Sequence, residues 1–333
     1  GPAISAPRQT EGAFVMPDGA RLPYRAWLSP SRPWAVVLAL HGFNDSRDAW
    51  EYPAPQMAEA GVTVFAPDQR GFGAAPGRGL WPGTETLVDD ARTMARLVQA
   101  RYPHTPLFLM GESMGGAVLI LLATSPDPPP AAGYVLVAPA VWGRAEMNLF
   151  IQAALWGAAT FLPGVRVTGH ELPLHIRASD NMEALIRLSD DPLTIRRTRF
   201  DTIMGLVNLM DAAQRAAPRF HAPALFLYGG KDQLVPGDAM RAFWRTLPAG
   251  ERLAYYPQGY HLLLRDLARA LPLLDILSWM RHPDAPLPSG ADRAAARWLA
   301  RPPARHGPAN GPAISSPGLS PGDVSRYAVR TDP

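Results

Sequence analysis

A serine in the middle of a Gly-x-Ser-x-Gly pattern is the residue best suited to chemistry in this 333-residue sequence. The pattern runs from Gly111 to Gly115 with Ser113 at its centre. It follows the apolar run Leu107 to Met110 and precedes the apolar stretch Ala117 to Ala123. A strand, a sharp turn and a helix in this order hold the serine at the apex of the turn, with its hydroxyl accessible. We therefore predict that Ser113 is a nucleophile.

A serine hydroxyl is a weak nucleophile at neutral pH, so it needs a base, and the base needs an acid that orients it. In a strand-turn-helix arrangement of this kind, the expected chain order is serine, acid, histidine. Asp232 follows the apolar run Ala224 to Tyr228, and His261 follows the run Arg252 to Tyr256 after a short turn that contains glycine. We predict that both side chains project from the same sheet edge as the serine, with Asp232 as the acid and His261 as the base.

The developing oxyanion needs backbone donors beside the serine. One donor in this arrangement is the amide of the residue after the nucleophile, here Met114. The other comes from an earlier loop, and the run that starts at Leu38 ends in His41-Gly42-Phe43, where glycine lets the backbone turn toward Ser113. We predict that the amides of Phe43 and Met114 form the oxyanion hole.

Three other polar residues receive structural roles. His41 precedes the serine in the chain and is expected to hold its loop rather than act as the base. Asp238 and Asp266 are expected in the first turns of the helices that follow Asp232 and His261, where an acidic side chain favours the positive end of the helix dipole.

The elements that must position these residues alternate between short apolar runs and amphipathic stretches. The stretch Thr84 to Ala100 has helical periodicity, and Leu267 to Met280 predicts a closing apolar helix. This alternation predicts an α/β fold with a mostly parallel sheet flanked by helices. We expect core residues 12–140 and 220–282, an inserted helical cap over 141–219, and a largely disordered tail over 283–333, where proline, glycine and alanine dominate.

Specificity is expected in the cap, because the core supplies only generic machinery. Met147 to Leu162 is rich in large apolar side chains. Both a helix packed over the sheet and a cap that touches lipid and lines an acyl tunnel are open interpretations. The candidate pocket walls, for each of which core packing is the default alternative, are Trp50, Trp142, Leu149 and Trp156.

Five strings in one order carry a resemblance to a known family: His41 to Phe43, Asp68 to Gly73, Gly111 to Gly116, Gly229 to Pro236 and Gly259 to Asp266. On these strings the chain resembles the α/β-hydrolase superfamily, and within it the monoacylglycerol lipase and bacterial lysophospholipase-like branch. The resemblance covers about residues 12 to 282.

The resemblance implies an acyl-enzyme mechanism on single-chain lipid esters, with transient contact between the cap and a membrane surface. It also implies that Asp68 and Arg70 brace the loops around the site. A broad short- or medium-chain carboxylesterase is the alternative, and a non-catalytic binding protein is a lesser one, because a binding protein would be expected to lack a triad residue.

Composition excludes several other classes. The chain has no cysteine, so thiolate catalysis is ruled out. A net charge of +3 from scattered arginines does not predict a nucleic-acid partner. Neither a metal nor another cofactor is expected, since outside the proposed triad no histidines and acids have ligand spacing. The Ala/Pro-rich start resembles the stretch after a cleaved leader, which favours a bacterial cell-envelope location.

Overall fold

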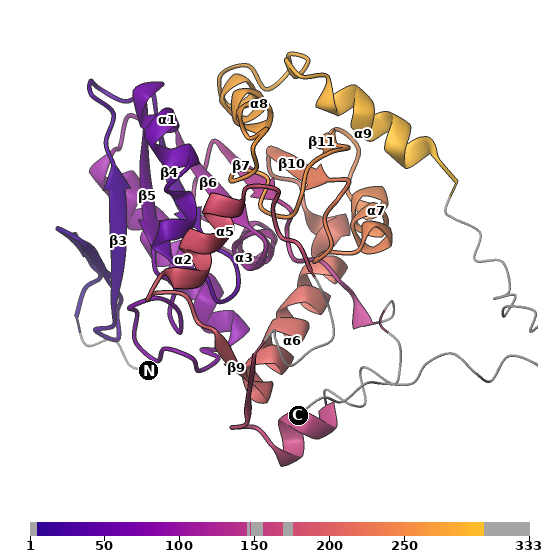
Figure 1. Ribbon diagram of the computed structural model, residues 1–333. Coiled ribbons are helices and arrows are strands. Elements are labelled where there is room, and N and C mark those ends of the chain that lie inside the picture. Colours follow the sequence, from indigo (N-terminus) through magenta and orange to yellow (C-terminus); the bar gives the residue numbers. More distant parts are fainter. Residues whose placement is uncertain (1–4, 145–146, 148–155, 169–175, 303–333) are drawn as a thin grey trace, which may run out of the picture. The chain divides into compact units, whose positions relative to one another are not determined.

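A nine-stranded sheet forms the centre of the computed structural model, which describes residues 5–144, 147, 156–168 and 176–302. The strand order is β1-β2-β3-β5-β4-β6-β7-β10-β11 (Figure 1). The pairs β1–β2, β2–β3 and β3–β5 are antiparallel, and the remaining pairs are parallel. The strands of this sheet are β1 (Arg8–Thr10), β2 (Ala13–Val15), β3 (Arg21–Trp27), β4 (Ala35–Leu40), β5 (Val62–Pro67), β6 (Leu107–Glu112), β7 (Gly133–Val137), β10 (Ala224–Gly229) and β11 (Arg252–Tyr256).

Helices cover both faces of the sheet, which confirms the predicted fold class. Side chains that alternate along β4 enter two separate cores, with Val36, Leu38 and Leu40 in one and Ala35, Val37 and Ala39 in the other. The first core is shared with α2, α3, α6 and α7, and the second with α1 and α8. Their bounds are α1 (Pro53–Glu59), α2 (Thr84–Arg101), α3 (Met114–Ala123), α6 (Phe200–Ala216), α7 (Gly237–Thr246) and α8 (Ala270–Arg281).

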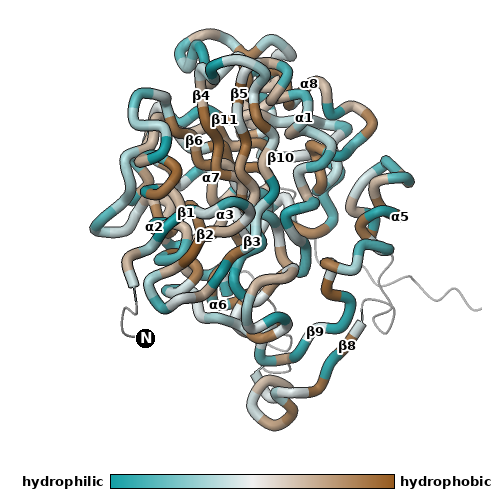
Figure 2. Tube along the Cα trace, turned by 90° about the vertical axis from the view of Figure 1, so that its left-hand side faces the viewer, coloured by the Kyte–Doolittle hydropathy of each residue, from teal (hydrophilic) through white to brown (hydrophobic). Residues whose placement is uncertain are grey.

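Because helices cover both faces of the sheet, the sequences of its central strands are continuous apolar runs and do not alternate between apolar and polar residues. Figure 2 shows the hydrophobic strands gathered inside the molecule. The parallel pairing also aligns the carboxyl ends of the strands: Leu40 lies opposite Gly111, and Gly229 lies opposite Tyr256. The loops that follow β4, β6, β10 and β11 therefore start at one edge.

The predicted cap boundary at residue 219 is wrong, because α6 belongs to the core. Leu209, Ala213 and Ala216 are buried in the same cluster as α3. The cap elements in the described part of the chain are a helical segment at 156–161, α5 (Met182–Asp190) and the antiparallel pair of β8 (Arg166–Thr168) and β9 (Arg197–Arg199). In Figure 2, α5, β8 and β9 lie to one side of the sheet.

The predicted start of the tail at residue 283 is also too early. Helix α9 (Ala291–Ala300) packs on β11, and its Trp298 is buried. The Trp298 ring stacks on Tyr255 at 4.7 Å between centroids, with the planes 8° apart. A single buried tryptophan anchors a stretch that its composition marks as poor in core residues, so the packed unit extends to Arg301.

Within the described residues, no helix combines the length and the apolar character needed to span a membrane.

Candidate active site

Ser113 occupies a strained turn between β6 and α3. Its backbone φ of 52° lies in the left-handed region that side chains rarely adopt. Glycine makes the turn possible: a Cβ on Gly111 would lie 2.5 Å from the Gly115 carbonyl carbon, and one on Gly115 would lie 2.2 Å from the Leu40 oxygen. Strain at a non-glycine residue persists only where the surroundings enforce it, which is typical of functional sites. The strand-turn-helix geometry predicted for Ser113 is therefore present.

Asp232 and His261 meet at the same edge. The Nδ1 atom of His261 lies 2.7 Å from Oδ2 of Asp232, and both side chains are almost fully buried. The other carboxylate oxygen of Asp232 accepts hydrogen bonds from the amides of Leu234 and Val235 at 2.8 and 2.9 Å. A carboxylate can only accept, so Nδ1 carries the proton and Nε2 is left free to act as a base.

The loops that carry these two residues touch through their glycines. A Cβ on Gly229 would lie 2.4 Å from the carbonyl oxygen of Gly259, and one on Gly230 would lie 2.7 Å from the Pro257 oxygen. Both loops follow parallel strands and so start at one edge, and the close contact between their backbones explains why both contain glycine.

The pKa of His261 lies above its ordinary value of 6.5. Burial alone would lower it, but the charge of Asp232, the hydrogen bond to it and the charge of Glu112 together outweigh burial. Glu112 directly precedes Ser113 in the chain. The imidazolium form of His261 is therefore favoured by two carboxylates, of which Glu112 was not predicted from the sequence.

The two predicted oxyanion donors flank the serine. Met114 opens α3, so its amide belongs to the first turn, which the helix itself cannot satisfy. The turn before Phe43 packs directly on the nucleophile, because a Cβ on Gly42 would lie 3.3 Å from the Cβ of Ser113. Phe43 is held edge-on against Phe72, with 5.7 Å between the ring centroids. Both residues lie in segments next to Ser113, and the role of their amides as oxyanion donors stays a prediction.

His41 has the geometry of a structural residue. Its Nε2 accepts a hydrogen bond from the amide of Gln69 at 3.0 Å, so Nδ1 carries the proton that faces the Gly42 oxygen at 2.8 Å. The ring is fully buried, and this burial is the main reason that its pKa lies below the ordinary value. A neutral ring with both nitrogens occupied holds the loop and is not available as a base.

The segment after β5 braces the loops, as the resemblance implies. Asp68 is fully buried and accepts hydrogen bonds from the amides of Arg47 and Ala74 at 2.7 and 2.8 Å. Arg70 pairs with both Asp18 and Asp90, at 2.5 and 2.9 Å.

Asp238 lies in the first turn of α7, as predicted, but the role predicted for Asp266 is wrong. Asp266 is buried and precedes α8 by four residues. It accepts hydrogen bonds from the Ser179 hydroxyl at 2.6 Å and the Tyr260 amide at 2.8 Å, so it ties the cap chain to the loop of His261. The sequence gives no local signal of this, because Ser179 lies 87 residues away.

The four residues predicted to line the substrate pocket lie in different environments. The prediction for Trp50 is wrong, because its side chain is fully buried in the core with Ala54 and Met57. Leu149 lies outside the described residues. Trp142 is half-buried after β7, and Trp156 is 62% exposed on the cap, with its ring edge-to-face against Phe161. Neither tryptophan is established as a pocket wall.

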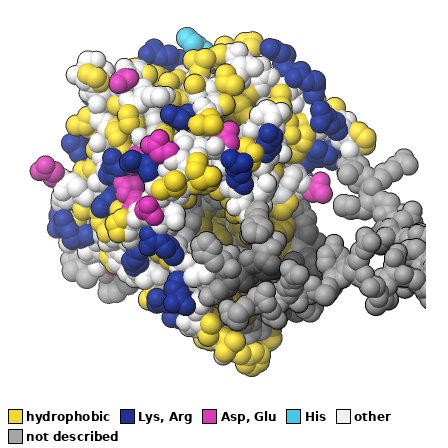
Figure 3. All heavy atoms as spheres, viewed as in Figure 1, with side chains coloured by type: hydrophobic (Ala, Val, Ile, Leu, Met, Phe, Trp, Pro, Cys, Tyr) yellow, Lys and Arg dark blue, Asp and Glu magenta, His cyan; other side chains and the backbone are white. Residues whose placement is uncertain are grey.

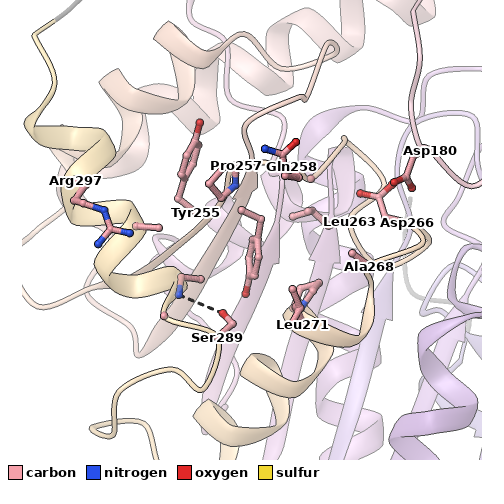
Figure 4. A pocket seen from close by; sticks show the side chains of 16 residues that line it. Asp180, Tyr255, Pro257, Gln258, Leu263, Asp266, Ala268, Leu271, Ser289 and Arg297 are labelled. Carbon is pink, nitrogen blue, oxygen red and sulfur yellow. Dashed lines mark hydrogen bonds between the residues drawn. The ribbon is translucent and has the colours of Figure 1, made fainter.

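A cavity of about 330 Å³ lies behind the loop of His261, between that loop, the start of α8 and α9 (Figure 4). Tyr255, Leu263, Leu271 and Arg297 are among the side chains that line it. Ser113, Asp232 and His261 do not line it, so it is separate from the reactive groups.

Comparison with known proteins identifies the family of the chain. Residues 31–268 match the model of the family described as serine aminopeptidase, S33. The chain is 25% identical over 275 residues to the monoacylglycerol lipase of Mycolicibacterium smegmatis, a match that spans 82% of this chain and 97% of that protein. It is 27% identical over 296 residues to the monoglyceride lipase of Rattus norvegicus, across 84% and 96% of the two chains.

Among solved structures, a soluble variant of the monoglyceride lipase of Saccharomyces cerevisiae, in complex with a substrate analogue, superposes with a TM-score of 0.68. It is 21% identical in sequence, and the match covers 84% of this chain and 98% of that chain. This similarity confirms the α/β-hydrolase fold.

Proposed function

The chain belongs to the serine aminopeptidase S33 family of α/β hydrolases, and we propose that it hydrolyses carboxylic esters of single-chain lipids through an acyl-enzyme. The observation that carries this proposal is the buried His261–Asp232 pair, 2.7 Å apart, at the edge where Ser113 sits on its strained turn. A base with an oriented acid and a partly buried serine at the same sheet edge form the arrangement that acyl transfer requires.

In the acylation step, Nε2 of His261 takes the proton of the Ser113 hydroxyl as the oxygen attacks the ester carbonyl carbon. The carbonyl oxygen gains negative charge, which the amides of Phe43 and Met114 stabilise. Collapse of the tetrahedral intermediate expels the alcohol, which receives the proton from His261. The acyl group is then bound to Ser113 as an ester.

In the deacylation step, His261 removes a proton from a water molecule that attacks the acyl carbon. The same amides hold the oxyanion, and Ser113 leaves with the proton returned by His261. The products are a carboxylic acid and the free enzyme. Asp232 keeps the imidazole in the required tautomer and stabilises its cationic form in both steps.

Two observations support a lipid ester as the substrate. Similar proteins from a bacterium and a mammal are named monoacylglycerol or monoglyceride lipases. In addition, the cap presents large apolar side chains to solvent: Trp156, Phe161, Leu162 and Val165 are all exposed. Figure 3 shows hydrophobic side chains gathered at the lower tip of the molecule, where the helical segment 156–161 lies in Figure 1.

These four residues, which we call the cap patch, support transient contact with a lipid surface. Exposed aromatic and aliphatic side chains gain free energy when they enter the interface between head groups and acyl chains. The next residue, Arg166, is exposed and can remain among the head groups. A cap that docks on a membrane would place the site beside single-chain lipids dissolved in it.

A substrate series tests the proposal. Wild-type protein and Ser113→Ala are assayed on p-nitrophenyl esters from acetate to palmitate, on a monoacylglycerol, on lysophosphatidylcholine and on an amino-acid p-nitroanilide. The proposal predicts the highest kcat/KM on a long-chain ester and none with Ser113→Ala. A preference for acetate or butyrate over all long-chain substrates would identify a short-chain carboxylesterase, and turnover of the anilide alone would identify a peptidase.

A further inference from the structure

A cluster of three charged side chains is buried beside the reactive groups. Nη2 of Arg265 lies 2.5 Å from Oδ2 of Asp45 and 2.8 Å from Oε1 of Glu112. The three side chains are 4%, 9% and 2% exposed. The reaction steps described above use none of them.

A buried cluster of two acids and one arginine is expected to contribute little to the stability of the fold. Two carboxylates share one guanidinium, and all three side chains are almost fully removed from water. Nε of Arg265 has no hydrogen-bond partner among the described residues. Removing charges from water is costly, and apolar side chains of similar volume often serve a core as well or better. A role other than stability is therefore a reasonable expectation for these residues.

The cluster joins the three chain segments that present the reactive groups. Asp45 lies two residues after Phe43, Glu112 directly precedes Ser113, and Arg265 follows His261 by four residues. One guanidinium therefore fixes the distances between the oxyanion loop, the nucleophile and the base. Small errors in such distances have large effects on rate, because the reacting atoms must approach within bonding geometry.

We propose that Arg265 is a positioning residue of the hydrolytic site, and that Glu112, held by it, is a second carboxylate that stabilises the imidazolium form of His261. This inference rests on the proposed function, because it describes how the same site works. It adds two residues to a site that otherwise consists of a triad and an oxyanion hole.

The charges around His261 agree with this assignment. Asp232 and Glu112 both raise the pKa of His261, whereas burial and Arg265 lower it. Burial raises the pKa of Glu112, and the charge of Arg265 opposes this effect. His41, near Asp45, Asp68 and Arg265, has a lowered pKa because it is buried, so it adds no positive charge at neutral pH. Glu112, which Arg265 holds beside the nucleophile, thus adds to the effect of Asp232 on the base.

The first test is Glu112→Gln, which keeps the shape of the side chain and removes its charge. The proposal predicts that the acid limb of the kcat/KM profile moves to lower pH by about half a unit or more, which corresponds to about a threefold change in the protonation equilibrium. An acid limb in the wild-type position would overturn the electrostatic role of Glu112.

The second test is Arg265→Lys, which keeps the charge and cannot bridge both acids with the same geometry. We expect kcat to fall about ten- to hundredfold with KM within about twofold of wild type. A wild-type kcat would overturn the positioning role of Arg265. This variant carries the test alone if Glu112→Gln does not fold.

The matched control is Asp90→Asn, which breaks the ion pair with Arg70 away from the base. It is expected to lower Tm without moving the acid limb, which separates loss of a buried ion pair from the specific effect on His261. Labelling of wild-type Ser113 by a fluorophosphonate accompanies these assays. Absence of labelling would refute the proposed function and this inference with it. Labelling together with an unmoved acid limb in Glu112→Gln and a wild-type kcat in Arg265→Lys would refute only the inference.

Discussion

The sheet edge that carries Ser113, Asp232 and His261, which we call the catalytic edge, differs from the cap in how tightly it is packed. At the edge, Gly111, Gly115 and Gly229 each face backbone atoms so closely that a Cβ would lie 2.2 to 2.5 Å from them. In the cap, a Cβ on Gly157 would meet nothing within 4 Å. Large apolar side chains that the core would enclose are exposed on the cap, among them Trp156, Phe161, Leu162, Val165, Ile176, Met182 and Ile186.

This difference in packing fits the different tasks expected of the two regions, which are acyl transfer at the edge and recognition of the acyl chain in the cap. Acyl transfer depends on the distances between a few atoms. The tight backbone packing at the edge, which leaves no room for a Cβ at these glycines, holds those distances constant. Recognition of an acyl chain depends on apolar area, which is not directional, so a cap surface can change in detail and still serve. Substitutions at the edge should therefore affect chemistry or lower stability, and substitutions of the exposed apolar side chains on the cap should affect mainly which substrate is reached.

The largest effect is expected for Asp232→Asn. The oxygen of the new amide would stay with the N–H groups of Leu234 and Val235, so its NH2 group, a donor, would face Nδ1 of His261 and favour the wrong tautomer. We therefore expect kcat to fall on the order of 10⁴-fold. The matched control is Asp238→Asn, in the first turn of α7, which should keep wild-type kcat. Steady-state assays on a soluble p-nitrophenyl ester measure both, and equal activity of the two variants would contradict the assignment of Asp232.

The contrast in packing predicts opposite effects on stability for two identical substitutions. Gly115→Ala places a methyl group against the Leu40 carbonyl and should lower the free energy of unfolding by about 1–3 kcal/mol. Gly157→Ala lies in a helical segment with open space and should raise it by about 0.5–1 kcal/mol. Urea denaturation measures both, and a similar loss in the two variants would remove the distinction between the regions.

The cap patch is expected to matter only at a lipid surface. Trp156→Ser combined with Phe161→Ser should weaken binding to phosphatidylcholine vesicles about tenfold, which corresponds to ~1.4 kcal/mol. Hydrolysis of a water-soluble acetate ester should remain unchanged. Sedimentation with vesicles and the soluble assay together decide the point: equal loss in both would mean that these side chains support the fold or the site instead.

The smallest effect concerns pH. His261 must be neutral to accept a proton, and its pKa is raised, so the acid limb of kcat/KM should lie above the ordinary histidine value of 6.5. Because the folded state holds this proton more tightly, the same group stabilises the fold below that ordinary value, and the contribution disappears as pH rises through the folded pKa. A limb at or below 6.5 in the pH profile would show that burial outweighs the two carboxylates.

Local patterns predicted most of the sheet and the position of each triad residue. The apolar runs Trp34 to Leu40 and Val62 to Ala66, for example, have the length of buried strands and form β4 and β5, and glycine marked the turns after them. The strands β1, β8 and β9 were missed because each has three residues and no buried side chain.

Contacts between distant residues could not be predicted in the same way. Arg265 meets Asp45 across 220 positions, and nothing near either residue in the chain indicates the pair. The packing of Trp298 against Tyr255 likewise depends on where the chain returns after α8, which composition does not reveal. The acid at position 112, inside an otherwise apolar strand, was the one local signal of the buried charge cluster.

The central claim is that Ser113 is a nucleophile activated by His261, and active-site labelling tests it most directly. Wild-type protein, Ser113→Ala, His261→Ala and heat-denatured wild type are treated with a fluorophosphonate probe, and the modified peptide is identified by mass spectrometry. The account predicts one label on Ser113 of the native wild type and none on Ser113→Ala or denatured protein. It also predicts strongly slowed labelling of His261→Ala. Labelling of Ser113→Ala at the wild-type rate, or none of the native wild type, would contradict it.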